Sequence, residues 1–266
     1  HIVCMNALAP YAQARGDVAR AETWRNCSER LRVALNVNAW DGAWYRRGFF
    51  DNGAPLGSAI DDECRIDSIA QSWSVLSGKG DALHMRQAMD SVKTHLIDRE
   101  AKLAPLFTPP FDKSSSDPGY IKGYPPGIRE NGGQYTHAAI WSLIAFAELG
   151  DGEAVSELLT ILNPINRTKT RTDCLRYKIE PYVVAADIYT VGANRGRGGW
   201  SWYTGSAGWL YRAVIEYVLG LRKHGNVLNI TPSLPPQWPS YEAIYRYPNG
   251  KLHITVENDR HVMRGI

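Results

Sequence analysis

The sequence predicts a mainly helical protein, an α/α toroid or solenoid of helical hairpins, followed by antiparallel β structure. Amphipathic helical patterns occur in pairs, and each pair is joined by a short turn that contains Gly followed by Asp. The connections between pairs are long and rich in Gly, Pro and Trp, which is typical of functional loops gathered on one rim. After about residue 222 the pattern alternates between apolar and polar residues, as in β-strands.

The helices are expected in a fixed order along the chain. The expected pairs are 2–15 with 18–36, 63–77 with 81–97, and 134–149 with 151–162. The junctions RGD, GKGD and GDG each combine a helix stop at Gly with an acidic start of the next helix at Asp. Two further helices are expected over 181–190 and 206–221. The short turns would lie on one side, and the long connections 38–61, 98–133 and 163–200 on the other.

Strand patterns appear twice. Residues 39–58 have β-hairpin character, with Asn52-Gly53 as a turn signal. The last part of the chain alternates around a second turn signal, Asn249-Gly250. We therefore expect one domain over residues 1–221 and a second, β domain over residues 222–266. The second has too few strands to close a sandwich, and we expect the chain to be a piece of a longer protein.

Composition excludes several classes of function. The net charge is +3, from 30 basic and 27 acidic residues, and the basic residues are scattered, which argues against a nucleic-acid-binding surface. The four cysteines form no CxxC pair, which argues against a zinc site or a disulfide scaffold and favours reduced thiols. Nine Trp and fourteen Tyr accompany only five Phe. Such rings stack on the apolar faces of sugars, although they also serve in cores and interfaces.

Two glycine-rich stretches lead directly into expected helices. The first, "GYPPGIRENGGQYTHAAIW" (123–141), places Arg129, Glu130 and His137 at a helix start. The second, "GRGGWSWYTGSAGWLYR" (196–212), offers Thr204 as an N-cap residue and Gly205 for close backbone approach. A helix N-terminus with free N–H groups and a hydroxyl is able to bind an oxyanion. An ordinary helix cap and a structural histidine are the alternative interpretations of these residues.

Acidic residues provide further candidates. Asp61, Asp62, Glu63 and Asp67 lie near the start of one expected helix, where they could also be simple N-terminal helix charges. Glu130 lies between Arg129 and Asn131 in the first glycine-rich stretch, which is an unusual place for a solvated surface charge. Glu180 precedes Pro181 at an expected helix start, where capping and binding of a sugar hydroxyl are both possible roles.

Together, these motifs resemble those of the inverting disaccharide phosphorylases, glycoside hydrolase family 94. The two glycine-rich stretches and "EPYVVAADIY" (180–189) carry the resemblance. Two more motifs, "WYRRGFFDNGAPLGS" (44–58) and "DECRIDSIAQSWSVLSG" (62–78), point to the β-1,2-glucan branch, which includes oligoglucan phosphorylases and the C-terminal domain of cyclic β-1,2-glucan synthases. The resemblance covers about residues 1–250. It implies that residues 1–221 are the C-terminal part of an (α/α)6 barrel and that a small β-sandwich domain begins at residue 222.

The resemblance also implies a chemistry. An inverting hydrolase needs an acid and a basic carboxylate that activates water, whereas in a phosphorylase the phosphate is itself the nucleophile. By resemblance, the phosphate is held by His137, Thr204 and Gly205. The residues that would bind the sugar are Arg129, Glu130, Glu180, Gln71, Trp200 and Trp202. The general acid of the family is an aspartate in a Trp-Asn-Asp segment, which this sequence lacks. Asp41 belongs to another motif, so we expect the acid to lie upstream of residue 1 and the chain alone to be inactive.

The predicted activity is inverting phosphorolysis of β-1,2-glucan to α-glucose 1-phosphate, as part of a cyclic β-1,2-glucan synthase. No metal or cofactor is expected, and inorganic phosphate is the co-substrate. The expected partners are β-glucan oligosaccharides, phosphate and the upstream remainder of the polypeptide, with no nucleic acid and no membrane insertion. The expected location is cytoplasmic, with tethering to the inner membrane if the parent is a synthase. A non-catalytic glucan-binding or interaction module and an α/α-barrel glycoside hydrolase are the alternatives.

Overall fold

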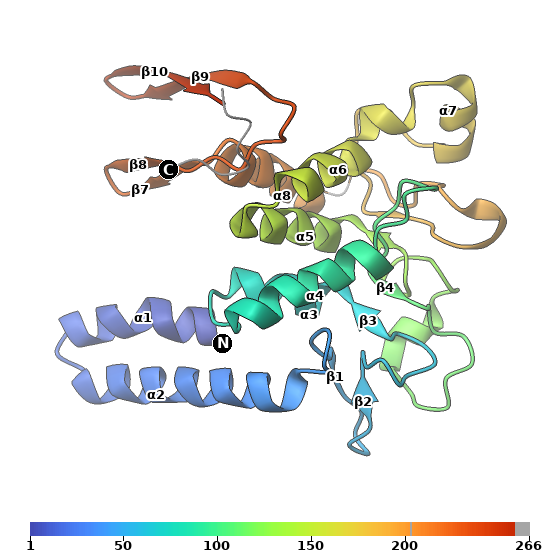
Figure 1. Cartoon of the computed structure of the whole chain (residues 1–266), viewed down its shortest axis with the longest axis horizontal. Helices are drawn as coiled ribbons and strands as arrows, with labels where there is room; N and C mark the ends of the chain where they lie inside the picture. The colour runs from blue at the N-terminus through green and yellow to red at the C-terminus, as the bar shows by residue number, and fades with distance from the viewer. Residues whose placement is uncertain (203, 259–266) are drawn as a thin grey trace.

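The structure is a computed structural model that describes residues 1–202 and 204–258. Helices dominate, and the strands described pair as two-stranded antiparallel sheets (Figure 1). The α-helices are α1 (Ile2–Ala14), α2 (Val18–Ala34), α3 (Ser68–Leu76), α4 (Ala82–His95), α5 (Thr136–Leu149), α6 (Gly152–Leu162), α7 (Arg171–Tyr177) and α8 (Thr204–Arg212). The strands are β1 (Gly48–Phe49), β2 (Pro55–Leu56), β3 (Ile66–Asp67), β4 (Phe107–Thr108), β5 (Gln134–Tyr135), β6 (Asp187–Ile188), β7 (Leu221–His224), β8 (Val227–Ile230), β9 (Ser240–Tyr247) and β10 (Gly250–Glu257).

The three predicted helix pairs are confirmed, and so is the role of the Asp in each turn as the start of the second helix. The side chains of Asp17, Asp81 and Asp151 each accept a hydrogen bond from a backbone N–H in the first turn of α2, α4 and α6, respectively. Gly150 ends α5 in the left-handed conformation, with φ of 74°, which glycine adopts without strain. Figure 1 shows the short turns toward one end of the helices and the long loops toward the other.

Helix α5 lies at the centre of the core. Its sequence is apolar around most of its circumference, and Leu143, Ile144 and Phe146 are at most 1% exposed. It packs against α3, α6 and α8 and against the π-helical segment Ala213–Val218 that continues α8. Because α5 is held on several sides, its first turn has a fixed position at the loop end of the molecule.

Three predictions about the helices were wrong: one boundary, one helix that does not form and one helix that was not expected. The helix expected over 63–77 begins only at Ser68, because Asp67 pairs with Phe107 in a short sheet and caps the helix. No helix forms over 181–190. That segment consists of turns and strand β6, in agreement with its β-branched and aromatic residues. Helix α7 lies in what was expected to be a loop, and Thr170 caps it.

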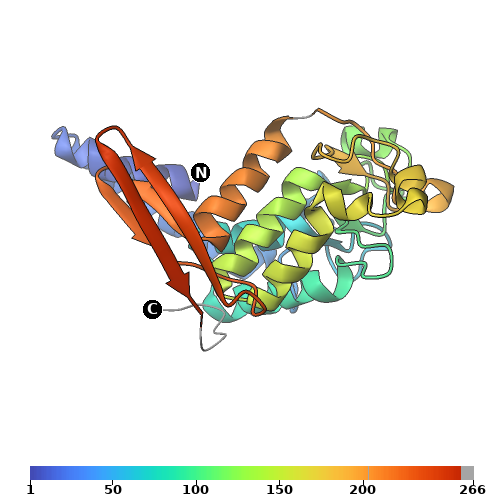
Figure 2. The same cartoon turned by 90° about the horizontal axis from the view of Figure 1, so that it is seen from above.

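Both predicted turn signals are confirmed. Asn52 and Gly53 lie in the turn between β1 and β2. Asn249 lies in the turn before Gly250, which pairs with Tyr247 at the start of the β9–β10 hairpin. The helix expected over 206–221 gives way to β7 at Leu221. Figures 1 and 2 both show the hairpins β7–β8 and β9–β10 at the same end of the molecule as the α1–α2 pair. Residues 259–266 of the predicted second domain lie outside the described residues.

Among the residues described, the helices are too short or too polar to cross a lipid bilayer.

Candidate functional site

The two glycine-rich stretches lie on opposite sides of one short segment, residues 186–190, and each is hydrogen-bonded to it. On one side the N–H of Thr136 donates to the carbonyl of Ala186, at 2.9 Å, and Gln134 pairs with Ile188. On the other side the N–H of Ala186 donates to the carbonyl of Trp200, at 2.8 Å. The segment therefore joins the loop before α5 to the loop before α8, and it brings the two stretches close together.

The loop before α5 is tightly built and needs its glycines. Arg129 and Gly132 have positive φ angles of 50° and 75°, a conformation that glycine adopts easily and arginine rarely. A Cβ atom on Gly133 would lie 2.7 Å from the carbonyl oxygen of Arg129. The buried amide of Asn131 donates to the carbonyls of Phe111 and Tyr124, at 2.9 and 2.8 Å. These contacts fix the direction in which the side chains of residues 129 and 130 point.

Arg129 and Glu130 form a half-buried pair. The guanidinium of Arg129 lies 5.4 Å from the ring centre of Tyr124 and 5.0 Å from that of Trp200. Its Nε lies 3.6 Å from the Oε2 of Glu130. Both atoms are buried, and neither has a hydrogen-bond partner. Trp200 is nevertheless 61% exposed, so the pair lies beside an aromatic face that a ligand can reach.

His137 is the second residue of α5 and lies against two tryptophans. Its ring centre is 4.5 Å from that of Trp141 and 5.6 Å from that of Trp209 in α8. The Nε2 atom is buried and has no hydrogen-bond partner. Burial lowers the pKa of His137 from its ordinary value of 6.5, since desolvation disfavours the charged imidazolium. Burial therefore favours the neutral form of this imidazole.

Unpartnered buried polar atoms are concentrated at this place. In the described part of the chain ten buried side-chain nitrogens or oxygens lack a hydrogen-bond partner, and five of them belong to residues 129–141. These five are Arg129 Nε, Glu130 Oε2, Thr136 Oγ1, His137 Nε2 and Trp141 Nε1. A buried polar group without a hydrogen-bond partner costs about 1–3 kcal/mol. The ion pair between Arg129 Nε and Glu130 Oε2 offsets part of this cost, and the other three atoms are groups that a polar ligand would satisfy.

Asp187, in β6, is a residue of this region that the sequence analysis missed. Its carboxylate is 1% exposed and accepts hydrogen bonds from the N–H groups of Arg129 and Trp200. Burial raises its pKa. The only sequence signal was an aspartate inside the apolar run "VVAADIY", and the mistaken helix assignment concealed its meaning.

The second glycine-rich stretch reaches the site through Trp200 and Trp209. Thr204 begins α8, and Gly205 is exposed in its first turn. The side chain of Thr204 and the whole of residue 203 lie outside what the structure describes. The contact between Trp209 and His137 brings α8 against the first turns of α5.

Glu180 and Trp202 form a separate, exposed cluster. The indole N–H of Trp202 donates to Glu180 Oε1, at 3.0 Å. The ring centres of Tyr182 and Trp202 are 6.1 Å apart. Trp202 is 66% exposed and Tyr182 is 69% exposed. The cluster therefore presents two aromatic rings and a carboxylate to solvent. Glu180 does not cap a helix, contrary to one of the two interpretations of its motif.

Gln71, unlike the other predicted sugar-binding residues, is completely buried. It is 0% exposed on α3, and its Oε1 accepts from the N–H of Tyr45. Its Nε2 donates to the carbonyls of Tyr45 and Asp67, both at 2.8 Å. The structure therefore leaves no exposed atom of this side chain for a sugar, and its amide holds residues 45 and 67 together.

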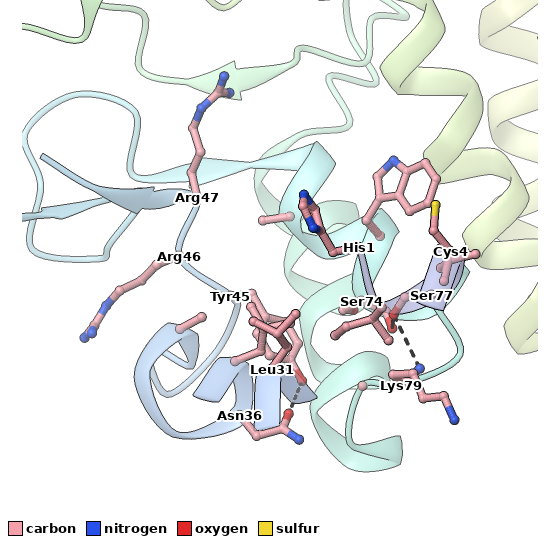
Figure 3. Close-up of a pocket in the computed structure, with 17 residues that line it drawn as sticks. His1, Cys4, Leu31, Asn36, Tyr45, Arg46, Arg47, Ser74, Ser77 and Lys79 are labelled. Carbon is pink, nitrogen blue, oxygen red and sulfur yellow. Dashed lines mark hydrogen bonds between the residues drawn. The ribbon is translucent and has the colours of Figure 1, made fainter. Parts of the chain in front are cut away.

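A hollow lies elsewhere, between the α1–α2 pair and α3 (Figure 3). It has a volume of about 780 Å³, and its lining includes Leu31, Tyr45, Trp73 and Lys79. None of the residues predicted to bind phosphate or sugar contributes to it. Within residues 1–202 and 204–258, no group of three His, Cys, Asp or Glu side chains is arranged to hold a metal ion.

Buried polar groups beside exposed aromatic rings are typical of sites for polar ligands with apolar faces, such as sugars. Residues 1–220 match the Glycosyl hydrolase 94 superfamily, catalytic domain. The chain therefore belongs to this family, as the motifs predicted.

Several characterised relatives can be aligned with the chain. It is 54% identical over 256 residues to the cyclic beta-(1,2)-glucan synthase NdvB of Rhizobium meliloti (strain 1021), an alignment that covers 96% of this chain and 9% of NdvB. It is 30% identical to the N,N'-diacetylchitobiose phosphorylase of Vibrio proteolyticus, covering 100% of this chain and 33% of that enzyme. The 1,2-beta-oligoglucan phosphorylase of Listeria innocua is 29% identical over 144 residues, 49% of this chain and 13% of that protein. The chain thus spans a third or less of these relatives.

Proposed function

We propose that residues 1–266 form the phosphate-binding and sugar-binding part of an inverting phosphorylase domain that acts on β-1,2-glucan. In the proposed reaction a phosphate oxygen attacks the anomeric carbon of the terminal glucose and the glucosidic C–O bond breaks. The leaving oxygen takes a proton, which gives α-glucose 1-phosphate and a shortened glucan. The 54% identity to a cyclic β-1,2-glucan synthase supports the linkage, and the related phosphorylases support phosphate as the nucleophile.

The observation that carries this proposal is the unpartnered Nε2 of His137 at the first turn of α5. The N-cap residue of α5, Tyr135, provides no side-chain hydrogen bond to the first turn. A helix N-terminus attracts anions through its free N–H groups and its dipole. A phosphate here would accept a hydrogen bond from His137, and Thr204 and Gly205 would supply further donors from the start of α8. Arg129, Glu130 and Trp200 would contact the sugar beside it, and Glu180 and Trp202 would contact a more distant part of the glucan.

We place the proton donor outside residues 1–266. Of the two carboxylates in this site, Asp187 is 1% exposed and already accepts two backbone hydrogen bonds. Asp187 is therefore not placed to activate water, and the proposal assigns the other carboxylate, Glu130, to the sugar. No carboxylate of this site is then left as the base of a hydrolase. The helix pairs would form part of an (α/α)6 barrel, and the hairpins β7–β8 and β9–β10 would begin a β-sandwich domain. The remaining helices and the acid would come from the rest of a longer, membrane-attached polypeptide at the cytoplasmic side.

Phosphate binding tests the central step. We expect the wild-type chain to bind inorganic phosphate in isothermal titration calorimetry and His137→Ala to bind about tenfold more weakly, a loss of about 1.4 kcal/mol. His84→Ala is the matched control, because His84 also has a buried unpartnered nitrogen and stacks on a tryptophan, Trp40 at 3.8 Å, on helix α4. The control should bind like the wild type. A wild-type chain that does not bind phosphate, or equal affinity in His137→Ala, would refute the proposal.

A second assay tests the origin of the proton donor. Linear β-1,2-glucooligosaccharides and phosphate are incubated with residues 1–266, and the release of α-glucose 1-phosphate is measured. We expect no release by this chain alone and release by a longer polypeptide that includes the upstream part. Turnover by residues 1–266 alone would place the acid within them and contradict this part of the proposal.

A further inference from the structure

Asp187 connects the two loops that carry the proposed sugar-binding residues. Its Oδ2 accepts from the backbone N–H of Arg129, at 3.1 Å, and its Oδ1 accepts from the backbone N–H of Trp200, at 3.3 Å. The side chains of these two residues meet directly, with the guanidinium 5.0 Å from the indole ring. One carboxylate therefore binds the main chain on both sides of a cation–aromatic contact.

The chain accommodates this carboxylate at a cost. Asp187 is 1% exposed, and burial raises its pKa, which shows that the environment disfavours its charged form. A Cβ atom on Gly199 would lie 2.2 Å from Asp187 Oδ1, so only glycine permits the approach of the second loop. Arg129 is held at φ of 50°, a region that is unfavourable for a residue with a side chain. These costs indicate that the carboxylate does more than fill space.

The start of α5, where the phosphate is proposed to bind, is held in place by contacts that do not involve Asp187. The first residue of α5, Thr136, donates its N–H to the carbonyl of Ala186, and Gln134 pairs with Ile188 through the backbone. His137 rests on the rings of Trp141 and Trp209. None of these contacts uses the side chain of Asp187. Its loss should therefore leave His137 and the helix start in place.

We infer that Asp187 is a positioning residue for the sugar ring and not for the phosphate. It holds Arg129 at the orientation in which the Arg129–Glu130 pair lies beside Trp200, and it fixes the backbone of Trp200 itself. Glu130 then offers a hydrogen-bond acceptor for hydroxyl groups, and the exposed face of Trp200 offers a stacking surface for the apolar face of a pyranose. This inference rests on the proposed function, because it assigns a ligand to one half of that site.

The test separates the two ligands. Binding of inorganic phosphate and of a linear β-1,2-glucooligosaccharide is measured separately by calorimetry on wild type, Asp187→Asn and Asp151→Asn. In Asp187→Asn an amide NH2 replaces one acceptor oxygen and faces a backbone N–H. We expect this variant to bind the oligosaccharide at least about tenfold more weakly and to bind phosphate within about twofold of wild type. Asp151 is the control, because it is another aspartate that accepts a backbone hydrogen bond, and it lies at the far end of α5.

The outcomes are distinct. Equal loss of both ligands would show a general structural role, and unchanged oligosaccharide binding would show no role. Either result would overturn the inference while the proposed function stands. A wild type that binds neither ligand would overturn the proposed function itself. If Asp187→Asn does not fold, Gly199→Ala displaces the carboxylate without removing it and should give the same selective loss of oligosaccharide binding.

Discussion

The substitution Gly133→Ala tests the packing of the loop before α5. The new methyl group would lie 2.7 Å from the carbonyl oxygen of Arg129, 2.9 Å from the backbone nitrogen of Arg129 and 3.2 Å from the carbonyl oxygen of Gly127. All three atoms belong to the backbone, so no side-chain rotation relieves the clash. The loop has to move by several tenths of an ångström. That movement stretches the hydrogen bond from the Arg129 N–H to Asp187, which is already 3.1 Å long.

The cost can be estimated from this geometry. Overpacking against a rigid neighbour costs about 1–3 kcal/mol, which for a chain of this size corresponds to a fall in Tm on the order of 2–10 °C. Differential scanning calorimetry measures that shift. Titration of the same sample with a β-1,2-glucooligosaccharide should show weaker binding than in the wild type, because Arg129 and Glu130 move with the loop.

Gly208→Ala is the matched control. Gly208 lies in α8, and a Cβ atom there would have no neighbour within 4 Å. In a helix, alanine is more favourable than glycine by up to about 1 kcal/mol, so this variant should be as stable as the wild type or slightly more stable. A Gly133→Ala protein with wild-type Tm and wild-type oligosaccharide affinity would refute our account of the loop.

Two further predictions concern α5. Burial lowers the pKa of His137 below its unfolded value of 6.5, so its contribution to stability is complete above pH 6.5 and is lost as the pH falls toward the folded pKa. On acidification the Tm of the wild type should therefore fall more than the Tm of His137→Gln. A Tm difference that does not depend on pH would contradict the lowered pKa. Leu143 is 0% exposed in the core, so Leu143→Ala should lower the free energy of unfolding by about 2–5 kcal/mol in urea titrations, whereas Leu83→Ala, at a side chain that is 78% exposed, should change it by less than about 0.5 kcal/mol.

The helix pairs could be predicted because their signals are local. Gly followed by Asp ends one helix and begins the next through hydrogen bonds within a few residues, and the side chains of Asp17, Asp81 and Asp151 make those bonds. Likewise, the glycines before α5 and α8 and the histidine at the first turn of α5 were visible as a motif. The helical hairpins and the place of these candidate residues at helix starts therefore followed from short-range chemistry.

The remainder depends on contacts that are distant in sequence. Pro181 after a glutamate predicts a helix over residues 181–190, yet the segment forms turns and strand β6 between two loops that it contacts only in the folded protein. For the same reason nothing local marked Asp187 as a partner of residues 129 and 200. Gln71 lies in a family motif, but its burial depends on a contact with Tyr45, which is 26 residues earlier in the chain.

The central position of residues 186–190 has a consequence for the order of folding. The pairing of Gln134 with Ile188 closes a loop that contains all of α5, α6 and α7, and such closure carries an entropic cost that local helix pairs avoid. We therefore expect the helical hairpins to form early and the binding site to be completed late. During synthesis, the chain would acquire most of its core before it could hold either ligand, and amide protons of residues 186–190 would exchange with solvent sooner than those of α5.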